Sequence, residues 1–242
     1  MTKEGNILEA GCGSGRFVYY LDKLGYNISG IELNADSVKK VNLRYPELKI
    51  NVGDVTKLSF KDESIDHIIS LGVIEHVIEG IDGPIREMYR VLKPGGIAFV
   101  IVPSFNLIRR IKYSLGILHL KAYFQKIKDN KFVRSLFNKP HKQAFNKVPP
   151  NSKYKSWPLF GRFYEYRFRK HEFEHELLKE NFKILESIPV SLMDGIYHEF
   201  GSSFVKLSDL TFKPNKIGNF LNNFLSKYPF THNHMHLCII EK

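Results

Sequence analysis

The sequence is poor in cysteine, in tryptophan and in long apolar runs. Its 242 residues include one tryptophan and two cysteines, Cys12 and Cys238, which are too far apart to form a short metal-binding motif. So few cysteines argue against a disulfide-stapled secreted domain. The longest apolar run, Ile97 to Pro103, is too short to cross a bilayer, and Met1 to Asn6 contains no apolar signal region. We therefore expect a cytoplasmic protein that is at most peripheral at a membrane.

Positive charge is concentrated in one segment. The formal net charge is +11, and residues 105–170 alone contain 17 Lys and Arg against two acids, Asp129 and Glu165. The rest of the chain carries 19 basic and 23 acidic residues, so it is mildly acidic. The basic segment is also rich in aromatic residues. We expect it to contact an anionic partner, a lipid-like molecule or a membrane surface.

The first hundred residues alternate short apolar runs with amphipathic stretches, which is typical of a parallel sheet covered by helices. We expect strands at 6–9, 27–32, 49–52, 65–71 and 97–102, and helices at 15–24, 35–45 and 81–92. A helix at 171–180 and strands at 183–189 and 236–241 complete the pattern. The sequence therefore predicts an α/β, doubly wound, Rossmann-like fold whose ligand lies beyond the carboxyl ends of the strands.

The alternation stops between residues 105 and 155. Leu107, Ile111 and Leu115 have helical spacing there. We therefore predict three parts: a Rossmann-like core at 1–104, a basic, mainly helical insertion at 105–170, and a C-terminal part of the core sheet at 171–242. The insertion would act as a lid or bind an acceptor.

A glycine-rich loop, Glu9-Ala10-Gly11-Cys12-Gly13-Ser14-Gly15, follows the first expected strand. Glycine lets a ligand approach the backbone where a Cβ would otherwise stand. The dinucleotide motif G-x-G-x-x-G would place its third glycine at position 16, which is Arg16. Glu32 ends the next strand, where a carboxylate can accept both hydroxyls of an unphosphorylated ribose. The loop and Glu32 together predict a nucleotide cofactor.

Glu9 favours S-adenosylmethionine (SAM) over NAD as that cofactor. A diphosphate prefers the amides of a helix N-terminus without a carboxylate nearby. Glu9 directly precedes the loop, where its charge would repel a diphosphate but would suit the ammonium and sulfonium of SAM. Charge therefore predicts a SAM site.

These motifs resemble the class I SAM-dependent methyltransferases, in particular the group that contains the ubiquinone and menaquinone biosynthesis enzymes. The resemblance covers residues 6–103 and is carried by Ile7 to Gly15, Gly30-Ile31-Glu32, Gly53-Asp54-Val55, Ile65 to Ser70, Ile74 to Val77 and Leu92 to Gly96. It implies a seven-stranded sheet of order 3-2-1-4-5-7-6 and methyl transfer by direct displacement.

The resemblance also implies the cofactor contacts. The methionine and ribose portions of SAM would lie against Gly11, Cys12 and Gly13 near Glu9, the ribose on Glu32, the adenine against Leu33, Asp54 and Val55, and the methionine between Ser70 and Leu71. Residue type leaves two alternatives open. Asp54 also suits a turn, and Ser70 also suits a strand-end cap.

Glu75 and His76 are the catalytic candidates. A histidine near the carboxyl end of a strand can deprotonate a hydroxyl because its pKa is close to neutral. Related quinone O-methyltransferases add an acid three residues before this Glu to bind a divalent metal, but that position is Gly72 here. We predict no metal, neither there nor at His232, His234 and His236. The alternative is that Glu75 and His76 make only structural contacts at a helix start.

The predicted acceptor is a small or lipid-like molecule. Residues that could line its pocket are Tyr164, Tyr166, His171, Tyr197, His198 and Glu199. An RNA methyltransferase that uses the basic insertion is an alternative, although Ser70-Leu71-Gly72-Val73 lacks the Asn/Asp-Pro-Pro-aromatic motif used on exocyclic base amines. A second alternative is a non-catalytic module, because few residues precede the first strand. The sequence predicts no oligomeric state.

Overall fold

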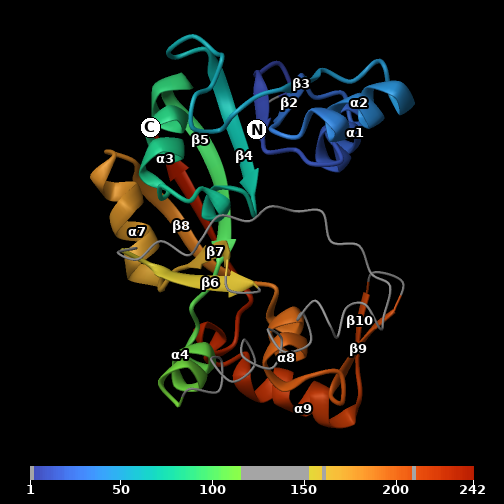
Figure 1. Cartoon of the computed structure of the whole chain (residues 1–242), viewed down its shortest axis with the longest axis vertical. Coiled ribbons are helices and arrows are strands. Elements are labelled where there is room, and N and C mark those ends of the chain that lie inside the picture. The colour runs from blue at the N-terminus through green and yellow to red at the C-terminus, as the bar shows by residue number, and fades with distance from the viewer. Residues whose placement is uncertain (1–2, 116–152, 160–161, 209–210) are drawn as a thin grey trace. The chain divides into compact units, whose positions relative to one another are not determined.

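The structure, a computed structural model, describes residues 3–115, 153–159, 162–208 and 211–242 (Figure 1). The chain divides into two compact units. Unit 1 comprises Met1–Val102, His171–Ile188 and Leu237–Lys242, and unit 2 comprises Pro103–Lys170 and Pro189–His236. No helix among the described residues has the length and apolar content needed to span a bilayer.

Unit 1 is built on a seven-stranded sheet. Its strands are β1 (Ile7–Ala10), β2 (Ile28–Glu32), β3 (Ile50–Val52), β4 (Ile65–Leu71), β5 (Leu92–Pro103), β8 (Lys183–Val190) and β11 (Met235–Glu241). They lie in the order β3-β2-β1-β4-β5-β11-β8, which is 3-2-1-4-5-7-6 when only the strands of this sheet are numbered. The first five pair in parallel. The predicted fold class and strand order are confirmed.

Helices follow the strands of unit 1 as the sequence predicts. They are α1 (Arg16–Lys23), α2 (Ala35–Arg44), α3 (Asp82–Val91) and α7 (Lys170–Lys179), with a short 3-10 helix, η1, at Ile74–His76. In α2, Asn34 caps the first turn by accepting the Ser37 N–H at 3.0 Å, while Val38 and Val41 are buried. Capping and a buried apolar stripe therefore set where this helix begins and which face it packs.

β5 begins earlier than predicted. The sequence predicted a helix ending at residue 92 and a strand at 97–102, but β5 starts at Leu92 and includes Lys93 to Gly96. Ile65 of β4 pairs with Leu92 and His67 pairs with Ile97, so extra residues bulge out of β5 between the two pairs. Gly95 allows the bulge with φ +75°, and its N–H donates to the Lys242 carbonyl at 2.9 Å.

Unit 2 combines short helices and strands. They are α4 (Leu107–Ser114), β6 (Lys155–Leu159), β7 (Arg162–Arg167), α8 (Leu192–Phe200), β9 (Val205–Ser208), β10 (Thr211–Pro214), α9 (Lys216–Leu225) and the 3-10 helix η2 (Pro229–Thr231). β6 pairs with β7 and β9 pairs with β10, both antiparallel.

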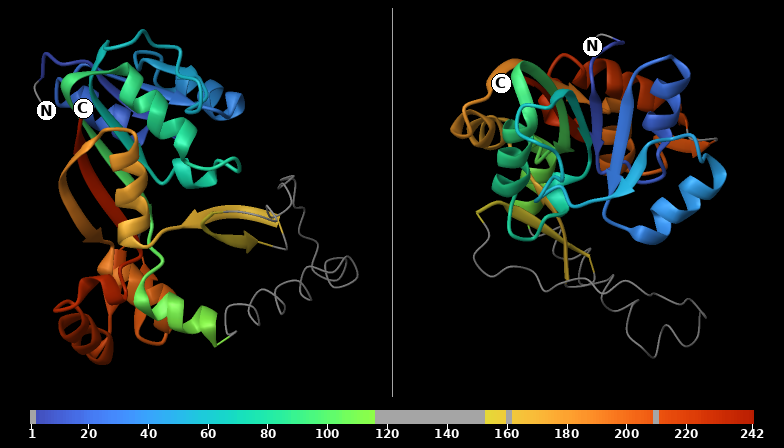
Figure 2. Two further views of the ribbon diagram at one scale, coloured as in Figure 1. Left: turned by 90° about the vertical axis from the view of Figure 1, so that its left-hand side faces the viewer. Right: turned by 90° about the horizontal axis from the view of Figure 1, so that it is seen from above.

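The insertion is only partly helical among the described residues. α4 confirms the predicted helical spacing at its start, but β6 and β7 form a hairpin where the sequence predicted no strand (Figure 2). Residues 116–152 lie outside the described residues. Tyr166 and Phe168 are buried, whereas Glu165 and Arg167 beside them are only half-buried, and this period-two alternation is typical of a strand.

The units also divide the chain differently from the predicted parts. The first boundary, between Val102 and Pro103, lies close to the predicted one after residue 104. Pro189–His236, however, clusters with unit 2, although the sequence assigned it to the C-terminal part of the core. The role of 105–170 as a lid or acceptor-binding segment stays a prediction.

Candidate cofactor site

The glycine loop lies between β1 and α1, beside the ends of β2 and β4. Because β2, β1 and β4 are parallel neighbours, their carboxyl ends meet at one edge of the sheet. The N–H groups of Gly11 and Cys12 both donate to the Ile31 carbonyl, at 2.9 and 2.8 Å. These bonds hold the loop against the end of β2.

The three glycines of the loop serve different purposes. All have left-handed φ, +85° at Gly11, +52° at Gly13 and +69° at Gly15. A Cβ on Gly11 would lie 2.4 Å from a Val73 methyl, and one on Gly15 would lie 2.5 Å from a methyl of Ile50, so both are needed for packing. A Cβ on Gly13 would have no atom within 4 Å. Gly13 therefore borders open space that a ligand can fill.

Glu32, at the end of β2, is hydrogen-bonded to Gly13 and so borders the same open space. One carboxylate oxygen accepts the Gly13 N–H at 3.0 Å and the other accepts the Asn34 N–H at 2.9 Å. A carboxylate has about four acceptor positions, so two backbone bonds leave capacity for ribose hydroxyls. Glu32, which is predicted to accept the ribose hydroxyls, thus lies beside Gly13, where the cofactor is predicted to approach the backbone.

Glu9 is buried, with 4% of its surface exposed. Its Oε2 accepts the Val18 N–H in the first turns of α1 at 3.1 Å. Burial raises its pKa to about 7, against the lowering effects of that hydrogen bond and of Arg16. Glu9 is therefore only partly ionised at neutral pH, and a nearby cation would favour its charged form.

The Cys12 side chain belongs to the core. Its thiol is buried beside Gly30, where an added Cβ would lie 2.8 Å from Sγ. Burial, reinforced by Glu9 and Glu32, raises the pKa of the thiol to about 12. Any contact of Cys12 with a cofactor would therefore be made by its backbone.

The residues predicted to surround adenine lie after β2 and β3. Leu33 is 69% exposed, as an adenine-packing side chain must be before its ligand arrives. Asp54 Oδ1 accepts the N–H and the hydroxyl of Thr56, at 2.8 and 2.7 Å, and Val55 is half-buried between them. These are the contacts of the turn alternative, so the adenine contacts of Asp54 and Val55 stay a prediction.

The end of β4 carries Ser70 and Leu71. Ser70 is fully buried, and within the described part of the chain its hydroxyl has no hydrogen-bond partner. The strand-end cap alternative would have required such a bond. An orphaned hydroxyl at the site edge fits the predicted contact with the methionine portion of SAM.

Glu75 and His76 lie in η1, directly after β4. Glu75 is buried, whereas 41% of the His76 side chain is exposed, and His76 Nε2 lies 3.9 Å from Glu75 Oε1. A buried acid beside a partly exposed imidazole can orient it. Val73, just before η1, packs its side chain where a Cβ of Gly11 would lie, so η1 lies close to the glycine loop.

Comparison with known proteins agrees with this geometry. Residues 8–100 match the protein family described as Methyltransferase domain. Over these residues the chain is similar to methyltransferase domains. The family and the fold imply SAM as its cofactor.

Two relatives carry related names. A probable SAM-dependent methyltransferase from Mycolicibacterium smegmatis is 32% identical over 46% of this chain, which spans only 41% of that relative's length. A demethylmenaquinone methyltransferase from Chlorobaculum parvum is 27% identical over 67% of this chain and 71% of its own.

Solved structures share the fold of the methyltransferase domain. One, a SAM-dependent methyltransferase from Methanosarcina mazei, has a TM-score of 0.59 at 18% identity and covers 100% of this chain and 94% of its own. A cyclase matches with a TM-score of 0.56 at 18% identity, over 98% of this chain and 75% of its own. Since a cyclase shares the fold, the fold alone does not define the chemistry.

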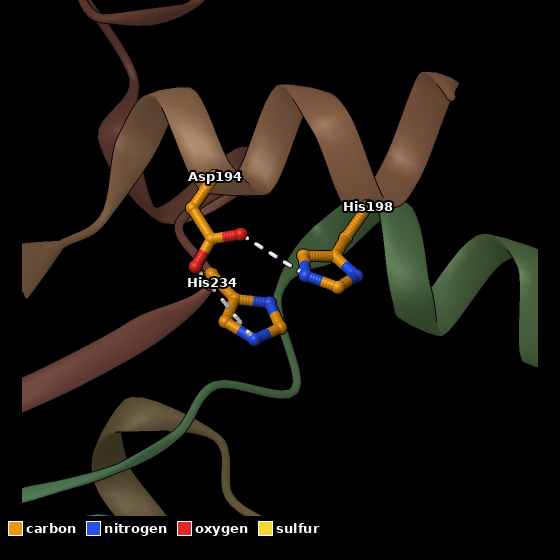
Figure 3. A group of neighbouring side chains, drawn as sticks. All are labelled: Asp194, His198 and His234. Carbon is orange, nitrogen blue, oxygen red and sulfur yellow. Dashed lines mark ion pairs between the residues drawn. The ribbon is translucent and has the colours of Figure 1, made fainter. Parts of the chain in front are cut away.

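Unit 2 contains one group of potential metal ligands among the described residues. Asp194 and His198 lie on α8 and His234 precedes β11 (Figure 3). His198 Nε2 lies 3.0 Å from Asp194 Oδ1, and His234 Nε2 lies 4.0 Å from Asp194 Oδ2. The sequence singled out His198 and His234 separately, but their spacing did not reveal that they meet.

Arg109 makes this group a poor metal site. Its guanidinium contacts Nδ1 of His234, and because arginine has only donors, Nδ1 must accept. Burial, with Arg109 reinforcing it, lowers the pKa of His234 to about 3, so the ring is neutral and its single proton sits on Nε2. Nε2 then has no lone pair for a metal. The geometry is that of a hydrogen-bonded cluster.

The same arginine is the centre of a buried ion network. Arg109 Nε donates to Glu199 Oε1 at 2.6 Å and Nη1 donates to the Ser104 carbonyl at 2.6 Å. Lys112 Nζ lies 3.0 Å from the other Glu199 oxygen. The network joins α4 to α8, a tertiary pairing that spacing alone could not predict.

Proposed function

We propose that the chain transfers the methyl group of SAM to a small-molecule or lipid-linked acceptor. The observation that carries the proposal is the open space at Gly13 beside the Glu32 carboxylate, inside a domain of the methyltransferase family. The demethylmenaquinone methyltransferase among the relatives is named for a lipid-like quinone acceptor, which supports this acceptor class.

In this proposal the residues at the carboxyl edge of the sheet position the cofactor. SAM supplies a methyl group on a positively charged sulfur. Glu32 accepts the ribose hydroxyls, Glu9 favours the positive charge, and the remaining predicted contacts are made by Gly11, Cys12, Gly13, Leu33, Asp54, Val55, Ser70 and Leu71. Alignment of the acceptor atom with the methyl group provides much of the acceleration.

His76 would act as the general base, with Glu75 orienting it. Its partly exposed imidazole can take a proton from an acceptor hydroxyl, whereas the buried Glu75 stays beside it. His76→Ala should lower kcat about 10²- to 10⁴-fold at unchanged SAM affinity. An unchanged kcat would assign the pair the structural role.

The acceptor is tested by methyl-labelled SAM incubated with the protein and cell extract, followed by separation into lipids, RNA and soluble metabolites. Label in lipids or soluble metabolites supports the proposal. Label in RNA would favour the alternative of an RNA methyltransferase that binds RNA through the positive charge of residues 105–170. Membrane contact through that segment would then lose its support. The Gly13→Val variant, processed identically, is the control for label transferred by other proteins.

A further inference from the structure

α9 exposes a stripe of large apolar side chains. Ile217, Phe220 and Phe224 follow one another at i, i+3 and i+7, which places them on one face of the helix. They are 58%, 67% and 56% exposed, and the rings of Phe220 and Phe224 stack with centroids 6.4 Å apart. Tyr228, just beyond the helix, is 65% exposed. Such a contiguous stripe marks an interaction surface.

The packing of α9 fixes this stripe on the outside. Gly218 lies on the opposite face and is buried, and a Cβ there would lie 2.2 Å from the Phe204 carbonyl oxygen. Asn215 caps the helix by accepting the Gly218 N–H at 2.8 Å, and its own N–H donates to the Phe204 carbonyl at 3.0 Å. The helix therefore cannot rotate to bury its phenylalanines without losing these contacts.

Positive charge surrounds the stripe. Residues 201–236 contain four lysines and one acid, Asp209, which lies outside the described residues. Lys213 lies in β10, Lys216 is the first residue of α9 and Lys227 lies two residues past its end, and all three are exposed. Lysine can lay its carbon chain along an apolar surface while its charged end reaches headgroups. Both ends of the stripe thus offer charge to an anionic surface.

We infer that this α9 face binds the surface of an anionic lipid bilayer. Phe220 and Phe224 insert between the headgroups, while Lys213, Lys216 and Lys227 contact anionic lipids. A second copy of the chain would bring the same lysines face to face, and like charges repel. The surface lies outside residues 105–170 and does not depend on methyl transfer.

Vesicle sedimentation tests the proposal with the full chain. Vesicles of 30% phosphatidylserine in phosphatidylcholine should bind the protein, and pure phosphatidylcholine vesicles should bind it far more weakly. Phe220→Ser with Phe224→Ser should lower the partition coefficient at least about tenfold, because the two rings that insert into the bilayer are lost. Each Lys→Gln change at 213, 216 and 227 should lower it roughly fivefold.

Asn219→Ser with Asn223→Ser is the matched control, since both asparagines are exposed on the same helix. It should leave the partition coefficient within about twofold, and Phe220→Leu should retain binding. If the double variant Phe220→Ser, Phe224→Ser bound vesicles as well as the parent chain, the proposal would be overturned. Vesicle binding through residues 105–170 would not rescue it. A dimer in solution that the phenylalanine variant dissociates, without vesicle binding by the parent chain, would also overturn it.

Discussion

The two units hold their charged side chains in different ways. At the strand ends of unit 1, Glu9 and Glu32 accept backbone N–H groups at 3.1 and 3.0 Å. In unit 2, Arg109 and Glu199 bind one another at 2.6 Å with 2% and 5% of their side chains exposed. A carboxylate held only by backbone N–H groups keeps lone pairs for a ligand, whereas paired ions neutralise each other. The carboxylates of unit 1 thus have acceptor capacity left over, and the ion network of unit 2 holds α4 to α8.

The pKa values of two buried glutamates, Glu9 in unit 1 and Glu199 in unit 2, shift in opposite directions. Burial raises the pKa of Glu9 to about 7. Burial also opposes ionisation of Glu199, but Arg109 and Lys112 outweigh it and hold its pKa below its usual range. Stability from Glu9 is therefore full below about pH 4.5 and is lost as pH rises through 7, whereas stability from Glu199 is lost as pH falls.

Breaking the ion pair should have the largest effect on stability. Arg109→Ala leaves the buried Glu199 carboxylate with only Lys112, which should cost about 3–5 kcal/mol in denaturant unfolding. Arg110→Ala, an exposed position on the same helix, should change stability by less than about 0.5 kcal/mol. If Arg109→Ala and Arg110→Ala lowered the free energy of unfolding equally, the buried ion pair would not stabilise unit 2.

Filling the space at Gly13 should have the largest effect on binding. Gly13→Val adds a side chain where nothing lies within 4 Å, so SAM affinity in calorimetry should fall at least about a hundredfold. Gly95→Val is the matched control, since Gly95 also has positive φ and open space but lies at the start of β5. It should show similar strain, about 1–2 kcal/mol, with unchanged SAM affinity. Equal loss of affinity in both variants would mean that Gly13 acts only through folding.

Glu32→Gln should weaken SAM binding about tenfold. The amide keeps one acceptor oxygen for two backbone N–H groups and loses the charge-assisted bonds to ribose. Asp36→Asn, an equal change of charge in the first turn of α2, should leave SAM affinity within twofold. If both changes weaken binding equally, general electrostatics and not the ribose contact explains the effect.

Glu9 should give the smallest effect and the clearest pH signature. Because a cationic ligand favours the ionised form, SAM affinity should rise up to about tenfold between pH 6 and pH 8. Glu9→Gln should remove this dependence and raise Tm at pH 8 by roughly 2–4 °C for each kcal/mol of relieved burial. A Tm that falls in the variant, with the pH dependence unchanged, would contradict the assigned position of the charge.

Sequence reasoning succeeded where local pattern and chemistry coincide. The β1 and β2 runs predicted the sheet, and the glycine loop and Glu32 meet at its edge because neighbouring parallel strands end there. The place of the cofactor stays a prediction. Sequence reasoning could not show that Gly11 and Gly15 serve packing while only Gly13 borders open space. That distinction depends on Val73 and Ile50, which are distant in sequence.

The contacts of unit 2 were less predictable because they also join residues that are distant in sequence. Arg109 meets Glu199 across 90 positions of sequence, and His234 meets Arg109 across 125. Such pairs leave no periodic signal. The β6–β7 hairpin was missed because the helical spacing of Leu107, Ile111 and Leu115 was extended to the whole insertion, although Tyr166 and Phe168 alternate with half-buried neighbours.

The most direct test is calorimetric titration of the folded chain with SAM and, separately, with NAD. We expect one SAM site per chain, weakened about tenfold by Glu32→Gln and at least about a hundredfold by Gly13→Val, and no measurable binding of NAD. A folded chain that binds no SAM, or that binds NAD more tightly than SAM, would contradict this expectation.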